Sequence, residues 1–303
     1  MVSLRLKYQY VHRKEKKAIF PNWKESEGRP EILPFKKIYH RHELEGLLDW
    51  AKRALLNPGE DYKSFIPDTP EFQARSERVR RDGIDRDEAF YSPNVIEVDI
   101  LGPGLPELSF YDLPGLFHAA EDSASEYLVP VYETMTKHYI NHKNALIICA
   151  MTMKNDPALS RAKALISEKK VEERCIGVLT MPDLLQKQSK AAQRDYDKIL
   201  HGKAYLLMDY FVTKQPDPEQ AKELHMKASR PGGLSYHEYA RMTEEKFFDS
   251  NELWTGEWSQ FRSKCGTQNI RKYLSKKFAS IILKRSVLKQ ISSIFCSSHL
   301  TCF

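Results

Sequence analysis

Cysteine is scarce in this chain, and the few cysteines that occur are not paired in sequence. The 303 residues contain five cysteines, an odd number, and no two of them form a Cys-x-x-Cys motif. This usage argues against a disulfide framework and against a thiolate zinc site. Cys149 and Cys175 lie inside apolar runs that are typical of strands. We therefore expect both to be buried, reduced thiols of a cytosolic protein.

Long apolar runs are missing as well. No uncharged stretch of the sequence reaches the roughly 18 residues that a membrane-spanning helix needs. Arg5 and Lys7 interrupt the first residues, so we expect no secretory signal peptide. Hydrophobic residues nevertheless make up 41% of the chain and aromatic residues 11%, which is enough for a core. The charged fraction of 29% fits a globular protein with solvated helices.

Positive charge exceeds negative charge, and part of the excess stands near the start of the chain. The formal net charge is +6. A basic surface can meet anionic lipid or nucleic acid. No recognition helix or base-stacking module accompanies these residues, so we interpret them as a solvated face and expect no nucleic-acid partner. The basic residues near the start are Arg5, Lys7, Arg13, Lys14, Lys16 and Lys17.

Strand and helix patterns alternate along the middle of the chain. This alternation predicts a mainly parallel sheet with flanking helices. Residues 60–90 are charged and poorly patterned, and we expect a long surface loop or an insertion there. Residues 270–283 carry apolar side chains at helical spacing, which predicts an amphipathic helix that packs on another helix. Strands are expected at 1–11, 95–101, 108–111, 145–150, 175–179 and 205–212, and helices at 42–56, 121–139, 157–169 and 188–200.

The first motif with chemical meaning follows the expected strand 108–111. It consists of Asp112, Leu113, Pro114 and Gly115. At this point of a phosphate-transferring GTPase a carboxylate holds Mg²⁺, usually through water, and a glycine lets a backbone N–H approach the γ-phosphate. Asp112 and Gly115 are thus the candidate catalytic residues. The motif is short, and a plain turn residue at a strand end is the alternative for Asp112.

The second motif follows the expected strand 175–179 and runs from Thr180 to Asp183. An aspartate carboxylate offers two acceptors, and guanine offers two adjacent donors, the ring N–H and the exocyclic amine. Adenine has an acceptor at that ring position and lacks the amine, so a fixed Asp183 would discriminate for guanine. A capping role for Asp183 at the following helix is the alternative.

Several short segments match one family in order along the chain. With them the sequence resembles the dynamin superfamily of large GTPases, especially its fungal members, over about residues 1–290. The segments are 92–95 (Ser-Pro-Asn-Val), 102–103 (Gly-Pro), 110–115 (Phe-Tyr-Asp-Leu-Pro-Gly), 127–130 (Tyr-Leu-Val-Pro), 155–156 (Asn-Asp), 177–180 (Gly-Val-Leu-Thr), 210–214 (Tyr-Phe-Val-Thr-Lys) and 265–267 (Cys-Gly-Thr).

The resemblance implies a fold and a division of the chain. The fold is α/β: an incomplete P-loop GTPase-type, mainly parallel sheet with flanking helices, followed by the start of a helical bundle or stalk. Residues 1–262 would form a partial dynamin-type GTPase domain, and residues 263–303 the truncated start of the bundle. The resemblance further implies a cytoplasmic protein, peripheral on organelle membranes, with membrane or microtubule association and self-association through its C-terminal helix.

The resemblance also implies guanine nucleotide as the ligand, with GTP and Mg²⁺ as cofactors. Asp112 would bind the metal through water. Thr213 and Lys214 stand where the last base-contacting loop of the family begins. The residues expected to contact nucleotide are Asp112, Leu113, Pro114, Gly115, Thr180, Asp183, Thr213 and Lys214.

Two departures from the family pattern concern activity. The family has Gly-x-x-x-x-Gly-Lys-Ser/Thr before these segments, whereas the only Gly-Lys pair here is Gly202-Lys203, which follows Asp183. The opening strand resembles the one just after the family's switch threonine, so we expect an N-terminally truncated domain without the phosphate cradle or that threonine. Met181 stands where the family usually has lysine; methionine can pack on the base but brings no charge.

These features leave two functions open. In the first, the chain is a GTP-binding or GTP-hydrolysing domain of a family that remodels membranes, and its activity is weakened or lost because the phosphate-binding loop is missing. Alternatively it is an interaction module with a GTPase-like fold and no nucleotide turnover. Asp112, Gly115 and Asp183 favour the first, and the missing loop favours the second.

Overall fold

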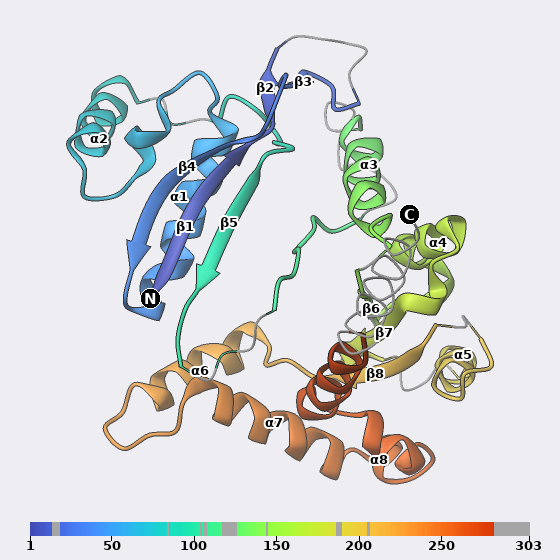
Figure 1. The fold of residues 1–303 in the computed structure, drawn as a ribbon. Coiled ribbons are helices and arrows are strands. Elements are labelled where there is room, and N and C mark those ends of the chain that lie inside the picture. The colour runs from blue at the N-terminus through green and yellow to red at the C-terminus, as the bar shows by residue number, and fades with distance from the viewer. Residues whose placement is uncertain are drawn as a thin grey trace, which may run out of the picture. The chain divides into compact units, whose positions relative to one another are not determined.

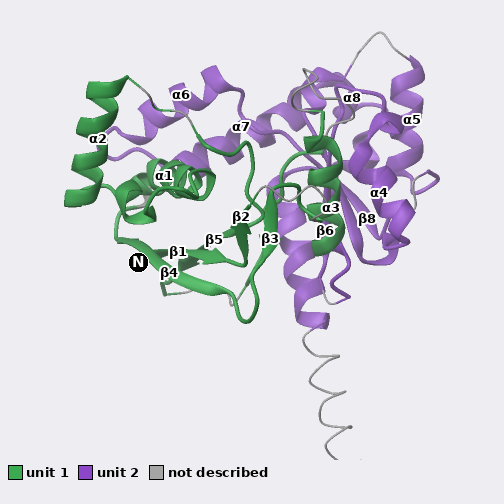
Figure 2. Cartoon of the chain, turned by 90° about the horizontal axis from the view of Figure 1, so that it is seen from above, with its two compact units in different colours: residues 1–139 green, residues 140–303 purple. Residues whose placement is uncertain are grey.

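The computed structural model describes residues 1–13, 19–83, 85, 87–103, 105, 108–116, 126–143, 145–185, 190–204 and 207–281. The chain divides into two compact units, residues 1–139 and residues 140–303, which are coloured separately in Figure 2. They are called unit 1 and unit 2. Together they make the α/β protein that the sequence predicts, with a parallel sheet in unit 2.

Unit 1 is built on an antiparallel sheet of three strands in the order β4 (Glu31–Ile38), β1 (Val2–Tyr8) and β5 (Val95–Ile100). Alternate residues of β1 are apolar, so one face of the strand is buried. The helix α1 (Leu44–Leu56) lies along this sheet (Figure 1) and contributes Leu47 and Ala51 to the shared core. These elements confirm the strands predicted at 1–11 and 95–101 and the helix predicted at 42–56.

The opposite face of β1 carries part of the basic start of the chain. Arg5 lies 2.9 Å from Asp99 and 3.2 Å from Glu97, and Lys7 lies 3.8 Å from Glu97. The positive charge of this strand is therefore paired across to β5. This pairing agrees with the interpretation of a solvated face. Lys14, Lys16 and Lys17 lie outside the described residues.

Unit 1 also contains a short ribbon and a second helix. A two-stranded ribbon pairs β2 (Tyr10–His12) with β3 (Trp23–Glu25). The helix α3 (Leu128–Ile140) begins later than the predicted helix 121–139, and residues 121–125 lie outside the described part of the chain.

The expectation of a loop at 60–90 is wrong, because this segment contains the helix α2 (Pro70–Asp82). The alternative of an insertion stays a prediction. This helix contains few apolar residues, so only the residues at its two ends indicate a helix in the sequence. The Thr69 side chain accepts a hydrogen bond from the backbone N–H of Phe72, and Pro70 occupies the first turn. At the other end Gly83 adopts φ +66°, the left-handed conformation that commonly terminates helices.

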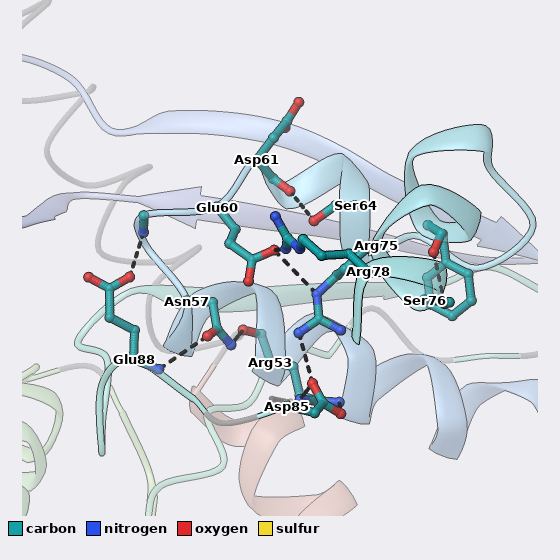
Figure 3. Close-up of polar contacts among 12 residues, drawn as sticks. Arg53, Asn57, Glu60, Asp61, Ser64, Arg75, Ser76, Arg78, Asp85 and Glu88 are labelled. Atoms are coloured by element: carbon teal, nitrogen blue, oxygen red, sulfur yellow. Dashed lines mark hydrogen bonds and ion pairs between the residues drawn. The ribbon is translucent and has the colours of Figure 1, made fainter. Parts of the chain in front are cut away.

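A buried arginine joins α2 to the segments around it (Figure 3). Arg75 is only 6% exposed; it lies 3.0 Å from Asp85 and 3.4 Å from Glu60. Its guanidinium carbon also lies 4.3 Å from the centroid of the Phe65 ring. Arg53 of α1 binds the same Asp85 through both of its terminal nitrogens. Asp85 therefore links α1 and α2 through two arginines.

The acid dependence of stability should report on Asp85. Its pKa is lowered to about 2, first by the hydrogen bond from Arg53 and then by the one from Arg75. In an unfolded chain the carboxyl returns to a pKa of about 3.9. The stabilisation is therefore complete above about pH 4 and is lost as the pH falls toward the folded-state pKa.

We expect Asp85→Asn to lower the free energy of unfolding at pH 7 by about 1 kcal/mol, a modest cost because solvent screens this partly exposed carboxylate. The deficit should shrink as the pH falls from 4 toward 2, and urea unfolding across that range measures it. Asp49, whose side chain is 68% exposed, supplies the control Asp49→Asn. A deficit that stays constant with pH would contradict the role of the Asp85 charge.

Unit 2 contains the parallel sheet, with strand order β6 (Ile147–Thr152), β7 (Cys175–Thr180) and β8 (Asp209–Thr213). The central strand β7 is buried along almost its whole length, as expected for a strand between two others. These strands confirm the predictions at 145–150 and 175–179 and the end of the one at 205–212. Cys149 and Cys175 are buried free thiols, as expected.

Helices alternate with the strands of this sheet along the chain, as predicted, and unit 2 also contains helices that were not predicted. The helices α4 (Arg161–Lys169) and α5 (Lys190–Leu200) match the predictions at 157–169 and 188–200. Two further helices, α6 (Pro218–Ala228) and α7 (Tyr236–Ser250), pack against each other. The short α8 (Glu252–Thr255) follows, and the last described helix covers residues 267–281.

The expected strand 108–111 is a second wrong prediction. These residues form no strand, and Leu108, Phe110 and Tyr111 are exposed. A strand exists only when a neighbour accepts and donates its backbone hydrogen bonds. Among the described residues, no strand pairs with residues 108–111, and the sheet of unit 1 ends at β5. The strands of unit 1 are also antiparallel, so the parallel part of the fold is smaller than predicted.

Candidate functional site

Three threonines mark one edge of the parallel sheet in unit 2. Thr152, Thr180 and Thr213 are the last residues of β6, β7 and β8, and they pair in register across the sheet. The loops after these strands therefore leave the sheet at neighbouring points. Ligands of open parallel sheets bind at this carboxyl edge, which makes these loops the candidate site.

The loop after β7 holds a residue in an uncommon conformation. Met181 adopts φ +55°, in the left-handed region that few residues other than glycine, asparagine and aspartate occupy. Its side chain is 50% exposed, and its sulfur lies 3.6 Å from the Thr152 hydroxyl. The backbone carbonyl of Thr180 accepts a bond from Met153 at 2.8 Å. The turn that begins at Pro182 then carries Asp183 at its centre.

The loop after β8 meets this turn. Lys214 is a buried charged residue, only 5% exposed, and its ammonium group lies 3.8 Å from a carboxylate oxygen of Asp183. The same ammonium donates to the amide oxygen of Gln220 at 2.9 Å. The Asp183 side chain is 33% exposed, so solvent and a ligand can reach it. The structure therefore brings together Thr180, Asp183, Thr213 and Lys214, four of the predicted residues.

Hydrogen bonds at the start of α6 fix this second loop. The Asp217 carboxylate accepts from the backbone N–H groups of Glu219 and Gln220, and the Gln220 side chain accepts from the backbone N–H of Asp217. Such a reciprocal pair, a capping box, holds the first turn of a helix. Gln220 thereby holds Lys214 with an amide oxygen that is itself anchored.

The first motif lies in unit 1 and is described by itself. Asp112, Pro114 and Gly115 are exposed, Leu113 is half-buried, and all four lie in a segment without helix or strand. The rings of Tyr111 and Tyr139 lie 4.6 Å apart just before the motif. A Cβ at Gly115 would meet no atom within 4 Å. The described surroundings therefore do not require glycine here, and its predicted role toward phosphate stays a prediction.

The side chains of the predicted site residues determine which metal or nucleotide they can bind. No cluster of three histidine, cysteine or acidic side chains occurs in the described part of the chain. Asp112 alone would therefore hold Mg²⁺ only through water and together with the oxygens of a bound phosphate. Asp183 is different, because two carboxylate oxygens at an open edge already suit the two donors of guanine.

Sequence reasoning missed two residues of this site, Gln220 and Glu244. Gln220 had a signal, since Asp217 stands three residues before it and Pro218 between them, which is the pattern of a helix start. Glu244 had none. It is buried and accepts the backbone N–H of Lys214 at 2.9 Å from 30 residues further along the chain.

The sequence is similar to known proteins of one family. A model of the Dynamin family matches residues 40–182. Dynamin-related protein 5A of Glycine max is 28% identical over 257 residues, 84% of this chain and 37% of its own. Phragmoplastin DRP1A of Arabidopsis thaliana is 27% identical over 260 residues, 85% of this chain and 38% of its own. Dynamin-like GTPase OPA1, mitochondrial, of Homo sapiens is 26% identical over 165 residues, 54% of this chain and 16% of its own.

The chain thus spans less than two fifths of the length of these relatives. The family match begins in unit 1, and it ends at Pro182, inside the loop that carries Asp183. An α/β fold with a parallel sheet, the ordered motifs and the matched relatives agree with one another. The family model and the matched relatives support a dynamin superfamily GTPase domain in this chain.

Proposed function

We propose that this chain binds guanine nucleotides and reads the base with Asp183. The observation that carries the proposal is the open carboxylate of Asp183 at the sheet edge, 3.8 Å from the buried ammonium of Lys214. The carboxylate accepts the two donors of guanine, and Lys214 holds the carboxylate in place. The exposed thioether of Met181 would pack on a face of the base. Adenine would leave the carboxylate unpaired, at a cost in affinity.

We further propose that these 303 residues hydrolyse GTP slowly or not at all. They contain no Gly-x-x-x-x-Gly-Lys-Ser/Thr segment. Phosphoryl transfer depends on positioning and on stabilisation of charge by a phosphate cradle, a lysine and Mg²⁺. When bound, Mg²⁺ neutralises charge on the phosphate oxygens. Asp112 would orient such an ion through water, and Gly115 would leave room for the γ-phosphate.

Single-turnover hydrolysis with the purified 303-residue chain in excess over GTP tests this proposal. We expect the chain to bind GTP measurably. We expect it to hydrolyse GTP at a rate close to that of the uncatalysed reaction. The variants Asp112→Ala and Asp183→Ala, with the helix-surface variant Asp195→Asn as the control, assign any residual activity. A fast rate that Asp112→Ala abolishes would contradict the proposal. The absence of any guanine preference would favour the interaction module instead.

The helix 267–281 supports a proposal about assembly. Its predicted apolar face is half-buried at each described position, and none of these side chains is fully buried. The Tyr273 ring contacts Phe211 of β8 at a centroid distance of 4.9 Å, so part of the face is covered. The residues of this face are Ile270, Tyr273, Leu274, Phe278 and Ile281, and the predicted Ile282 lies outside the described residues.

We expect the full chain to self-associate through this half-covered face, since a buried side chain of this type contributes about 1.5–3 kcal/mol. Sedimentation velocity at matched high concentrations compares the wild type with Leu274→Glu. The charge change should shift the protein toward the monomer, whereas Lys276→Glu, on the exposed side of the helix, should not. If wild type and Leu274→Glu sediment identically as monomers, the helix is not an association surface.

Family membership also supports a cytoplasmic location with peripheral attachment to organelle membranes and a role in their remodelling. One matched relative carries the word mitochondrial in its name and another is a phragmoplastin. In the part of the chain that the structure describes, no helix is both long enough and apolar enough to cross a bilayer.

A further inference from the structure

A buried carboxylate lies behind the loop that carries Lys214. Glu244 belongs to α7 and is only 3% exposed. One of its oxygens accepts the backbone N–H of Lys214 at 2.9 Å. The other accepts the backbone N–H of Thr267 at 2.8 Å and the Thr267 hydroxyl at 2.7 Å. Both oxygens of this buried carboxylate are thus used by hydrogen bonds.

The three donors come from two distant segments of the chain. Lys214 lies 30 residues before Glu244, and Thr267 lies 23 residues after it. Lys214 opens the loop after β8, and Thr267 is the first residue of the helix 267–281. Glu244 therefore ties the loop after β8 to the start of the helix 267–281.

The backbone around Thr267 is shaped for this contact. Gly266 adopts φ +92°, and its N–H donates to the carbonyl of Val212 in β8 at 2.8 Å. A Cβ on Gly266 would lie 3.6 Å from a Glu244 oxygen. A positive φ of this kind favours glycine. The chain thus turns sharply beside β8 and presents the Thr267 N–H to Glu244.

We propose that Glu244 is a positioning residue for the guanine site. By holding the Lys214 backbone, it fixes where the Lys214 ammonium meets Asp183, and by holding Thr267 it makes that position depend on the start of the helix 267–281. This inference rests on the proposed reading of guanine by Asp183. Glu244 itself touches no base, since its two oxygens are occupied by protein donors.

The substitution Glu244→Gln separates positioning from packing. Glutamine has the shape of glutamate, but it offers one acceptor oxygen and one donor amide. Whichever way the amide turns, either the Lys214 N–H or the Thr267 N–H then faces a donor and loses its partner. The neighbouring Glu245→Gln is the matched control, because its side chain lies on the same helix and is 53% exposed.

The experiment uses the full 303-residue chain and two readouts. Amide hydrogen exchange at Lys214 and Thr267 is measured without ligand, and the affinities for GDP and ADP are measured by titration. For Glu244→Gln we expect exchange at one of these amides to rise at least about tenfold and the preference for GDP over ADP to fall about five- to tenfold, in line with a buried N–H that has lost its acceptor. Glu245→Gln should match the wild type in both.

The outcomes distinguish the inference from the function on which it rests. A wild type without preference for GDP would overturn the proposed function and this role with it. A wild type that prefers GDP, together with a Glu244→Gln variant of unchanged preference, would overturn the positioning role alone. The positioning role is also wrong if Glu244→Gln raises amide exchange at Lys214 or Thr267 and leaves the ratio of the two affinities intact.

Discussion

Replacement of Asp183 by asparagine should abolish the preference of this chain for guanine. The amide keeps one acceptor but presents a donor where the carboxylate has its second acceptor, so one guanine donor would face another donor. Loss of charge-assisted bonds at this partly open site is expected to weaken GDP binding by about 2–4 kcal/mol, or roughly 30- to 1,000-fold. Competition titration with GDP and ADP measures the change.

The same substitution should create a new preference. Xanthine carries a carbonyl oxygen where guanine carries the exocyclic amine, and the asparagine amide can donate to that oxygen while it accepts the ring N–H. We therefore expect Asp183→Asn to bind xanthosine diphosphate better than GDP. Asp195→Asn in α5 should bind as the wild type does. Unchanged GDP affinity in Asp183→Asn would contradict base reading and favour the alternative, a capping role for Asp183.

Removal of the Trp258 ring should strongly destabilise unit 2. Trp258 is 1% exposed, and its ring lies 4.9 Å from that of Trp254, which in turn lies 5.2 Å from that of Phe248. These rings belong to the core that includes β7 and β8. Truncation of a buried aromatic side chain to alanine costs about 3–5 kcal/mol, and that is a large part of the stability of an ordinary domain.

Urea unfolding followed by circular dichroism measures the effect of Trp258→Ala. Phe90, which is 75% exposed, provides the control Phe90→Ala, and we expect a change below about 0.5 kcal/mol there. A loss from Trp258→Ala as small as that of the control would mean that the aromatic cluster does not stabilise the unit. A lower slope of the transition would instead indicate that unit 2 no longer unfolds as one body.

The parallel sheet and one half of the site could be predicted from the sequence because their signals are local. The apolar run 175–179 predicts a covered strand, and Asp183 and Lys214 follow the ends of two such runs. Parallel strands place their carboxyl ends at one edge, so the meeting of these loops follows from the pattern. The register that pairs Thr180 with Thr213 confirms it.

The wrong or missing predictions concern segments whose structure depends on interactions that the pattern of apolar residues does not show. The helix α2 is marked by Thr69, Pro70 and Gly83 at its ends, while its middle is highly charged. Residues 108–111 have the composition of a strand, but a strand also needs a hydrogen-bonded neighbour. In the sequence, Glu244 is one charged residue among others. Only the fold shows that its carboxylate accepts hydrogen bonds from Lys214 and Thr267.

The most direct test of a guanine-reading site is a side-by-side titration of the 303-residue chain with GDP and ADP. We predict that GDP binds at least about tenfold more tightly than ADP, as expected for about 1.4 kcal/mol or more of discrimination by a carboxylate, and that Asp183→Asn removes the difference. Equal affinities for GDP and ADP in the wild type would contradict a base-reading role for Asp183.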